Sequence, residues 1–125
     1  MKFDDKVPIY YQIKQYIYRE IIIEHLKPGQ QIPAVRQLAV TLTVNVNTIQ
    51  RALSELIDED VLVSKRGKGN FVTEDTEVLK NLKKRTVEEQ VSNLYDNLTA
   101  LRISPDKMLT YLENYINSRK EANHD

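Results

Sequence analysis

The sequence predicts a mainly α-helical fold with a small β-hairpin, because its apolar residues follow helical spacing except in one short region. Three segments of the first half show this spacing, and a short extended stretch separates the first from the second. Two β-favouring runs, VLVS and NFVT, then flank the glycine-containing stretch KRGKG, as expected for a hairpin. Two further amphipathic segments follow Thr73. This order predicts a winged helix-turn-helix domain over residues 1–73 and a two-helix tail over residues 74–125.

The first predicted helix covers residues 8–26 and begins with Pro8, whose missing N–H costs nothing in a first helical turn. Its apolar face is predicted to contain Ile9, Ile13, Ile17 and Ile21. The stretch KPGQQIP then ends the helix, because Pro28-Gly29 favours a turn and Pro33 is a second stop. This stretch holds the short strand expected before the next helix.

The second and third predicted helices are short, and a turn joins them. AVRQLAVTL forms the second, with its apolar face built from Val35, Leu38, Ala39 and Leu42. The third helix covers residues 47–57, and either Asn45 or Asn47 is expected to cap it. Its buried side is predicted to contain Ile49, Leu53, Leu56 and Ile57.

The tail is predicted to form a homodimer interface. Residues 74–103 contain no Gly or Pro, and a second helix is expected to follow with Ser104 as its N-cap and Pro105 as its first residue. Two such helices cannot bury their apolar faces alone, so they need each other and a further surface. The predicted interface residues are Val87, Val91, Leu94, Leu98, Leu101, Met108, Leu109, Leu112, Tyr115 and Ile116.

Composition excludes several classes of protein. The chain has no cysteine, and its apolar runs are too short to cross a bilayer, so a cytoplasmic protein without a membrane partner is expected. Neither His25 nor His124 has a second ligand at metal-binding spacing, so no metal or cofactor is predicted. No paired carboxylates, Ser/His set or phosphate loop converge, which argues against an enzyme. The net charge is zero, but residues 1–73 carry ten Lys and Arg against eight Asp and Glu.

Several motifs fall in a specific order across residues 7–73: PIY, LKPG, IP-x-VRQLA, NTIQRAL-x-L and RGKGNFV. In this order they resemble the amino-terminal domain of GntR-type bacterial transcription regulators. The short helical tail is similar to that of the YtrA-like branch, whereas larger members carry an effector-binding domain there. The resemblance implies a sequence-specific DNA-binding regulator, a repressor that binds a pseudo-palindromic operator as a homodimer. Whether a small-molecule effector acts on it stays open.

The start of the third helix carries the residues expected to read bases. Asn and Gln can pair bidentately with adenine, and Arg with guanine, and base contacts concentrate at the amino-terminal end of a recognition helix. The candidates are Asn45, Asn47, Thr48, Gln50 and Arg51. The alternative is that the two asparagines only cap the helix and the threonine faces solvent.

The resemblance also implies that Arg36, at the start of the second helix, contacts DNA. A surface salt bridge to Glu55 or Asp58 is the alternative use of this side chain. Ala34 stands where Ser is common in the family, so a hydroxyl for capping or phosphate binding is missing.

The hairpin tip is interpreted as a wing that contacts phosphates or a minor groove. It lacks the G-x-x-x-x-G-K-[ST] pattern, and no helix start follows it, so it does not fit a nucleotide-binding loop. The predicted DNA contacts are Lys65, Arg66, Gly67, Lys68 and Gly69. A plain solvated turn is the alternative for the tip alone. For the whole chain, the alternative is a winged-helix protein–protein module, which acidic residues at the start of the third helix would have favoured.

Overall fold

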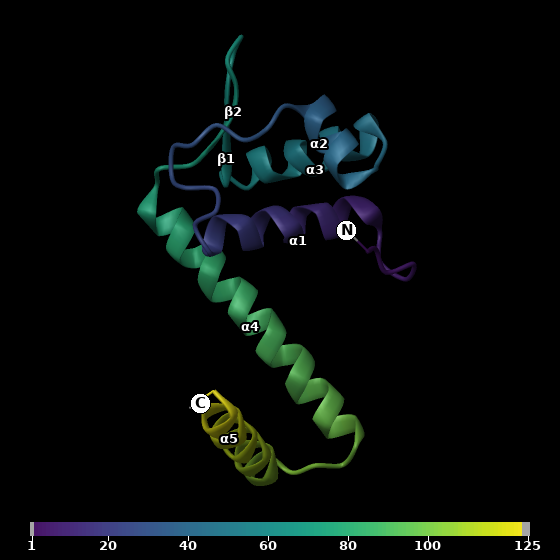
Figure 1. Ribbon diagram of the computed structural model, residues 1–125, viewed down its shortest axis with the longest axis vertical. Coiled ribbons are helices and arrows are strands. Elements are labelled where there is room, and N and C mark those ends of the chain that lie inside the picture. Colours follow the sequence, from purple (N-terminus) through teal and green to yellow (C-terminus); the bar gives the residue numbers. More distant parts are fainter. Residues whose placement is uncertain (1, 124–125) are drawn as a thin grey trace. The chain divides into compact units, whose positions relative to one another are not determined.

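The computed structural model describes residues 2–123, so His124 lies outside the described residues. Mainly helical structure with a small antiparallel wing is confirmed (Figure 1). The elements are α1 Ile9–Ile22, α2 Val35–Leu42, α3 Val46–Asp58, β1 Leu62–Lys65, β2 Gly69–Val72, α4 Thr76–Ala100 and α5 Pro105–Ala122. They form two compact units, residues 1–85 and 86–125. Across the part of the chain that is described, no helix has the length and apolar character needed to cross a membrane.

The core of the first unit lies between α1, α2, α3 and the base of the hairpin. Ile13, Ile49 and Leu56 are completely buried there, and burying one such side chain contributes about 1.5–3 kcal/mol. The predicted apolar faces of α2 and α3 pack into this core. Ile9 was predicted to join them, but it is 44% exposed. It is the first residue of α1 and instead lines a shallow hollow beside the start of α3.

The short strand expected before α2 is reduced to one isolated bridge between Gln31 and Phe71. The N–H of Ile32 donates to the carbonyl of Asn70 at 2.9 Å, and the N–H of Val72 donates to the carbonyl of Gln30 at the same distance. Pro33 follows directly and has no N–H with which to extend the ladder. The bridge is nevertheless enough to fix β2, and with it the hairpin, to the segment that enters α2.

The first turns of α4 belong to the same unit as the winged helix. Leu82 is only 1% exposed within the core cluster, and Val78 and Leu79 pack against that cluster. Asp75 starts the helix, since its Oδ1 accepts the N–H of Glu77 at 3.0 Å. The compact unit therefore ends after Arg85, within α4, whereas the sequence placed the domain boundary after Thr73.

The second unit contains the remainder of α4 and all of α5. The predicted start of α5 is confirmed, because Ser104 is its N-cap, accepting the N–H of Lys107 at 3.4 Å, and Pro105 is its first residue. Arg102, in the connecting turn, has a left-handed backbone with φ of 60°. No residue of α5 is buried, so this unit leaves most of its apolar side chains in contact with solvent.

Candidate nucleic-acid interface

The recognition helix α3 begins with a side-chain cap. Asn45 is the N-cap residue, and its Oδ1 accepts the N–H of Asn47 at 2.8 Å. Of the two capping candidates the structure therefore selects Asn45. Its oxygen is used locally, but its amide NH₂ can still donate to a base or phosphate. Asn47 and Gln50 are exposed on the helix, and Thr48 is half-buried.

Arg36 lies in the first turn of α2 and is exposed. The salt bridge to Glu55 or Asp58 that the sequence allowed is not formed: Glu55 pairs with Lys14 and Arg51 instead, and Arg36 has no ion pair within residues 2–123. Ala34, the N-cap of α2, makes no side-chain cap, as its lack of a hydroxyl requires. Helices α2 and α3 are joined by a tight turn in which Thr43 adopts a left-handed φ of 57°.

The wing is a regular two-stranded hairpin whose tip extends away from α2 and α3 (Figure 1). Lys65 pairs with Gly69 in the register, and the N–H of Lys68 donates to the carbonyl of Lys65 at 2.9 Å to close the turn. Gly67 has a φ of 74°, which only glycine adopts at little cost. Lys65, Arg66 and Lys68 are all exposed and have no ion pair within the described chain.

Gln31 fixes the wing tip to the body of the domain. Its Nε2 donates to the carbonyl of Lys68 at 2.7 Å. A Cβ on Gly69 would lie 2.8 Å from that same Nε2 and would displace the Gln31 side chain, and the φ of 111° at Gly69 is a backbone conformation that favours glycine. Lys65 Nζ also lies 4.5 Å from the centre of the Phe71 ring. The basic tip is thus joined by a hydrogen bond to the segment that enters α2.

Arg51 is held by two neighbours on the surface of the domain. Its guanidinium carbon lies 3.7 Å from the centre of the Tyr10 ring, which belongs to α1. Its Nε lies 3.5 Å from Oε2 of Glu55, one turn further along α3. Tyr10, Asn47, Thr48 and Arg51 line one shallow hollow together with Ile9. The predicted base-reading residues therefore lie next to the start of α1.

A half-buried ionic cluster joins α1, the end of α3 and the start of α4. Lys14, only 8% exposed, places its Nζ 2.6 Å from Oε2 of Glu59 and 3.1 Å from Oε1 of Glu55. Tyr18 donates a hydrogen bond to Glu59, and Nη2 of Arg85 lies 3.0 Å from that carboxylate. Glu59, the C-cap residue of α3, therefore contacts Lys14, Tyr18 and Arg85 at once.

The protonation of this cluster follows from its contacts. Burial alone would lower the pKa of Lys14, but the hydrogen bonds that its ammonium donates to Glu59 and Glu55 outweigh burial and raise that pKa. Burial and the hydrogen bond to Glu59 raise the pKa of Tyr18 to about 12. Burial opposes ionisation of Glu59, yet Lys14 and Tyr18 together lower its pKa. All three groups therefore keep their usual charge states near neutral pH.

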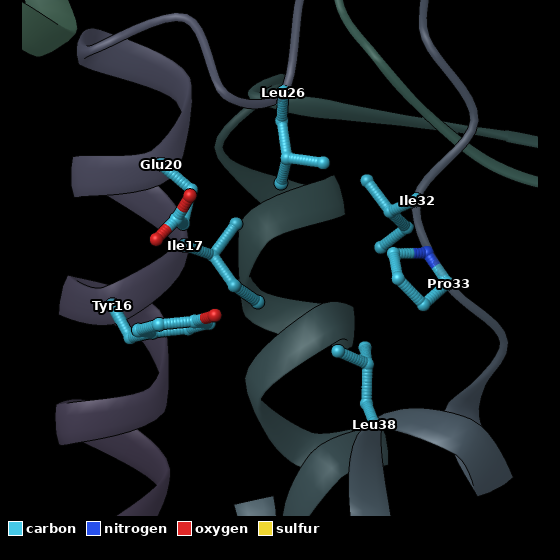
Figure 2. Close-up of a pocket in the computed structure, with 7 residues that line it drawn as sticks. All are labelled: Tyr16, Ile17, Glu20, Leu26, Ile32, Pro33 and Leu38. Carbon is cyan, nitrogen blue, oxygen red and sulfur yellow. The ribbon is translucent and has the colours of Figure 1, made fainter. Parts of the chain in front are cut away.

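A small cavity lies on the other side of α1, between this helix and the segment that enters α2. Figure 2 shows Tyr16, Ile17 and Glu20 facing Leu26, Ile32, Pro33 and Leu38 around it. Its volume of about 80 Å³ is well below the several hundred Å³ of small-molecule sites. This cavity is therefore too small to enclose a drug-sized ligand. Among the described residues no cluster of His, Cys, Asp and Glu could hold a metal ion.

The predicted dimer residues of the tail are largely uncovered in the single chain. Leu98 and Met108 are half-buried, and the other eight are exposed, up to 71% for Leu101 and 68% for Leu109. Between the two helices lies an open apolar groove of about 530 Å³. Its lining consists of Leu94, Leu98, Leu101, Ile103, Met108, Tyr111, Leu112 and Tyr115.

Comparison with known proteins identifies the family. Residues 9–72 match the model of the bacterial regulatory proteins, gntR family. The HTH-type transcriptional regulator YhcF of Bacillus subtilis is 31% identical over 114 residues, which cover 91% of this chain and 94% of that protein. The chain belongs to the gntR family. It is a transcription regulator with the DNA-binding winged helix of that family, and not an enzyme.

Further members of the gntR family refine this assignment. The HTH-type transcriptional repressor YtrA of B. subtilis is 34% identical over 88 residues, which cover 70% of this chain and 68% of that repressor. A GntR family transcriptional regulator from Listeria monocytogenes has a TM-score of 0.83 at 34% identity and covers 90% of this chain and 98% of its own. The DNA-binding domain of AraR, solved in complex with operator ORR3, has a TM-score of 0.53 at 30% identity and covers 58% of this chain and 88% of its own. The similarity to the YtrA-like branch, read from the length of the tail, is confirmed.

Two residues of this surface were absent from the predicted site. Gln31 holds the wing tip from 37 positions away, and no spacing rule connects it with Lys68. Glu55 could have been found, because it lies four residues after Arg51 on the same helix and opposite charges at that spacing pair.

Proposed function

We propose that this gntR-family chain represses transcription by binding a pseudo-palindromic operator as a homodimer. The observation that carries the proposal is the set of exposed cations on the winged helix, Arg36, Lys65, Arg66 and Lys68, none of which has an ion pair within the described chain. Cations held near a duplex release counterions from its phosphates, and this supplies much of the affinity. The AraR domain, solved with its operator, supports the same use of the fold here.

In this proposal the start of α3 supplies sequence discrimination and the wing supplies phosphate contacts. Asn47, Gln50 and Arg51 are exposed at or near the first turn of α3, where side chains of a recognition helix meet base edges. Thr48 is half-buried and contributes a hydroxyl to DNA binding at the edge of the same surface. Asn45 contributes its amide NH₂. Gly67 and Gly69 allow the backbone of the tip to turn tightly and approach the duplex.

The homodimer rests on the tail. Exposed apolar patches of this kind are rare on soluble monomers and mark interaction surfaces. We assign the groove between α4 and α5 to a second copy of the chain, since six of the ten predicted interface residues line it: Leu94, Leu98, Leu101, Met108, Leu112 and Tyr115. A ligand in that groove would compete with the partner copy. Any effector is therefore expected to act elsewhere or by changing the dimer.

A dimer places two recognition helices on one DNA molecule. Half-site centres are then expected about one helical turn apart, or a multiple of it. Linking two weak sites raises affinity through effective concentration, by up to about 10²–10⁴-fold. Repression is supported by the name of the relative YtrA, which is a transcriptional repressor.

The test is footprinting on the promoter upstream of the chain's own gene, followed by in vitro transcription from that promoter. Protection of two half-sites with loss of transcript supports the proposal. Binding that does not distinguish this promoter from random DNA would contradict it, and a rise in transcript would make the chain an activator instead.

A further inference from the structure

Arg51 lies on the surface but contacts two neighbouring side chains. Its guanidinium carbon lies over the ring of Tyr10, 3.7 Å from the ring centre, and its Nε lies 3.5 Å from Oε2 of Glu55. The pair with Glu55 involves Nε, and a guanidinium has further N–H donors on its two terminal nitrogens. These terminal groups form the fork that matches guanine or a phosphate.

Both neighbours of Arg51 are themselves tied to the body of the domain. Tyr10 packs against the hydrophobic core from α1. Glu55 receives the nearly buried Nζ of Lys14 on its Oε1, at 3.1 Å, and offers its other oxygen, Oε2, to Arg51. The carboxylate is thus oriented by one cation and orients a second. Through these contacts α1 determines where a side chain of α3 lies.

We propose that Tyr10 and Glu55 are positioning residues that hold Arg51 in the conformation in which it reads a base. This inference rests on the proposed function, in which Arg51 contacts the operator. A long side chain loses rotamer freedom when it binds, and a side chain already held loses less of it on binding. The benefit applies only to the DNA sequence whose base edge matches the held geometry, so it raises discrimination more than general affinity.

The opposite role would give the opposite result. If Tyr10 and Glu55 competed with DNA for the guanidinium, releasing Arg51 would improve operator binding. Removing the negative charge of Glu55 also strengthens binding to any DNA through general electrostatics. The quantity to measure is therefore the ratio of operator affinity to random-DNA affinity, in which the general effect cancels.

The experiment uses the full chain, a DNA site selected by the wild-type protein from a random pool, and a scrambled duplex of equal length. Fluorescence anisotropy gives both affinities for Tyr10→Leu, Glu55→Gln and the matched control Tyr10→Phe, which keeps the ring. The affinity ratio should fall about three- to tenfold in Tyr10→Leu and Glu55→Gln. It should stay within about twofold of wild type in Tyr10→Phe, because the stacked face remains. Circular dichroism melting tests whether each variant is folded. If Tyr10→Leu does not fold, the isosteric Glu55→Gln alone tests the positioning role.

The substitution Arg51→Ala separates this inference from the proposed function. In that background Tyr10→Leu and Glu55→Gln should no longer change the affinity ratio, because the residue they position is gone. If Arg51→Ala weakens binding to both DNAs equally, base reading by Arg51 is wrong and the positioning role is lost with it. If Arg51→Ala lowers the ratio but folded Tyr10→Leu and Glu55→Gln leave it unchanged, only the positioning role is wrong. A ratio that rises in Glu55→Gln would show that the carboxylate competes with DNA.

Discussion

The burial of Leu82 predicts that the DNA-binding unit needs the first turns of α4 in order to be stable. A chain that ends after Arg85 keeps these turns, and a chain that ends after Thr73 loses them. Leu82 is 1% exposed, and removing a leucine side chain from such a position costs about 2–5 kcal/mol. The shorter chain also loses Arg85, whose pair with Glu59 is about half exposed and contributes only about 0.2–1 kcal/mol.

The two losses together amount to about 2–6 kcal/mol, while a small domain has a total stability near 5 kcal/mol. Urea unfolding followed by circular dichroism should therefore show a cooperative transition for the chain of residues 1–85. Residues 1–73 should unfold at a much lower urea concentration, or already be partly unfolded in buffer. Neither chain contains the second unit, so dimer dissociation does not complicate the comparison.

Two substitutions in the 1–85 chain isolate the cause. Leu82→Ala should lower the free energy of unfolding by about 2–5 kcal/mol. Val40→Ala removes an apolar side chain from a helix too, but Val40 is 80% exposed, so its effect should stay within about 0.5 kcal/mol. Equal urea midpoints for the chains ending at Thr73 and at Arg85 would show that α4 contributes nothing to this core.

Four further predictions concern the interface, the tail and the ionic cluster. Asn47→Ala should cost about 1–3 kcal/mol on the selected site and little on random DNA in anisotropy titrations, whereas equal losses would make it a phosphate contact or a structural residue. Lys68→Ala should reduce the slope of log K against log salt by about 1, and an unchanged slope would mean that this lysine does not meet a phosphate. Leu98→Asp should sediment as a monomer and lose tight operator binding. The control Ser92→Asp, which adds the same charge at a residue outside the predicted interface, should remain dimeric. A dimeric Leu98→Asp would show that the interface lies elsewhere. The pKa of Glu59 is lowered in the folded chain, so the stability that its carboxylate contributes is present above the unfolded pKa. This contribution is lost as pH falls through the folded pKa. The melting temperature of Glu59→Gln should therefore depend less on pH below about 4.5 than that of wild type.

The fold could be predicted because local patterns and the tertiary structure agree in most of the first unit. The apolar faces of α2 and α3 were visible as helical spacing, and the glycines of KRGKG marked the hairpin. The burial of Leu82 was harder to foresee. Its neighbours Val78 and Leu79 lie four and three residues before it on the same helix face, but a pattern shows only that a face is apolar, not which surface covers it. That information depends on the packing of α4 against the core.

The site was predictable in its residue types but not in its contacts. Asn45 as a cap and Lys65, Arg66 and Lys68 on a tight turn follow from rules that act within a few residues. The stacking of Arg51 on Tyr10 joins positions far apart in sequence, and only the crossing of α1 and α3 brings them together.

A chain with zero net charge can still be expected to bind a polyanion, because two of its acidic residues lie in ion pairs while the basic residues of the wing have none within the described chain. The carboxylates of Glu55 and Glu59 lie within the domain's own ion pairs, with Lys14, Arg51 and Arg85. The segment from Val61 to Thr73, in contrast, contains three basic residues and no acidic one. Phosphates respond to the charge within about a Debye length, which is about 10 Å at 0.1 M salt, and not to the sum over the molecule. The salt dependence of binding should therefore follow the number of cations that meet phosphates at the wing and at Arg36.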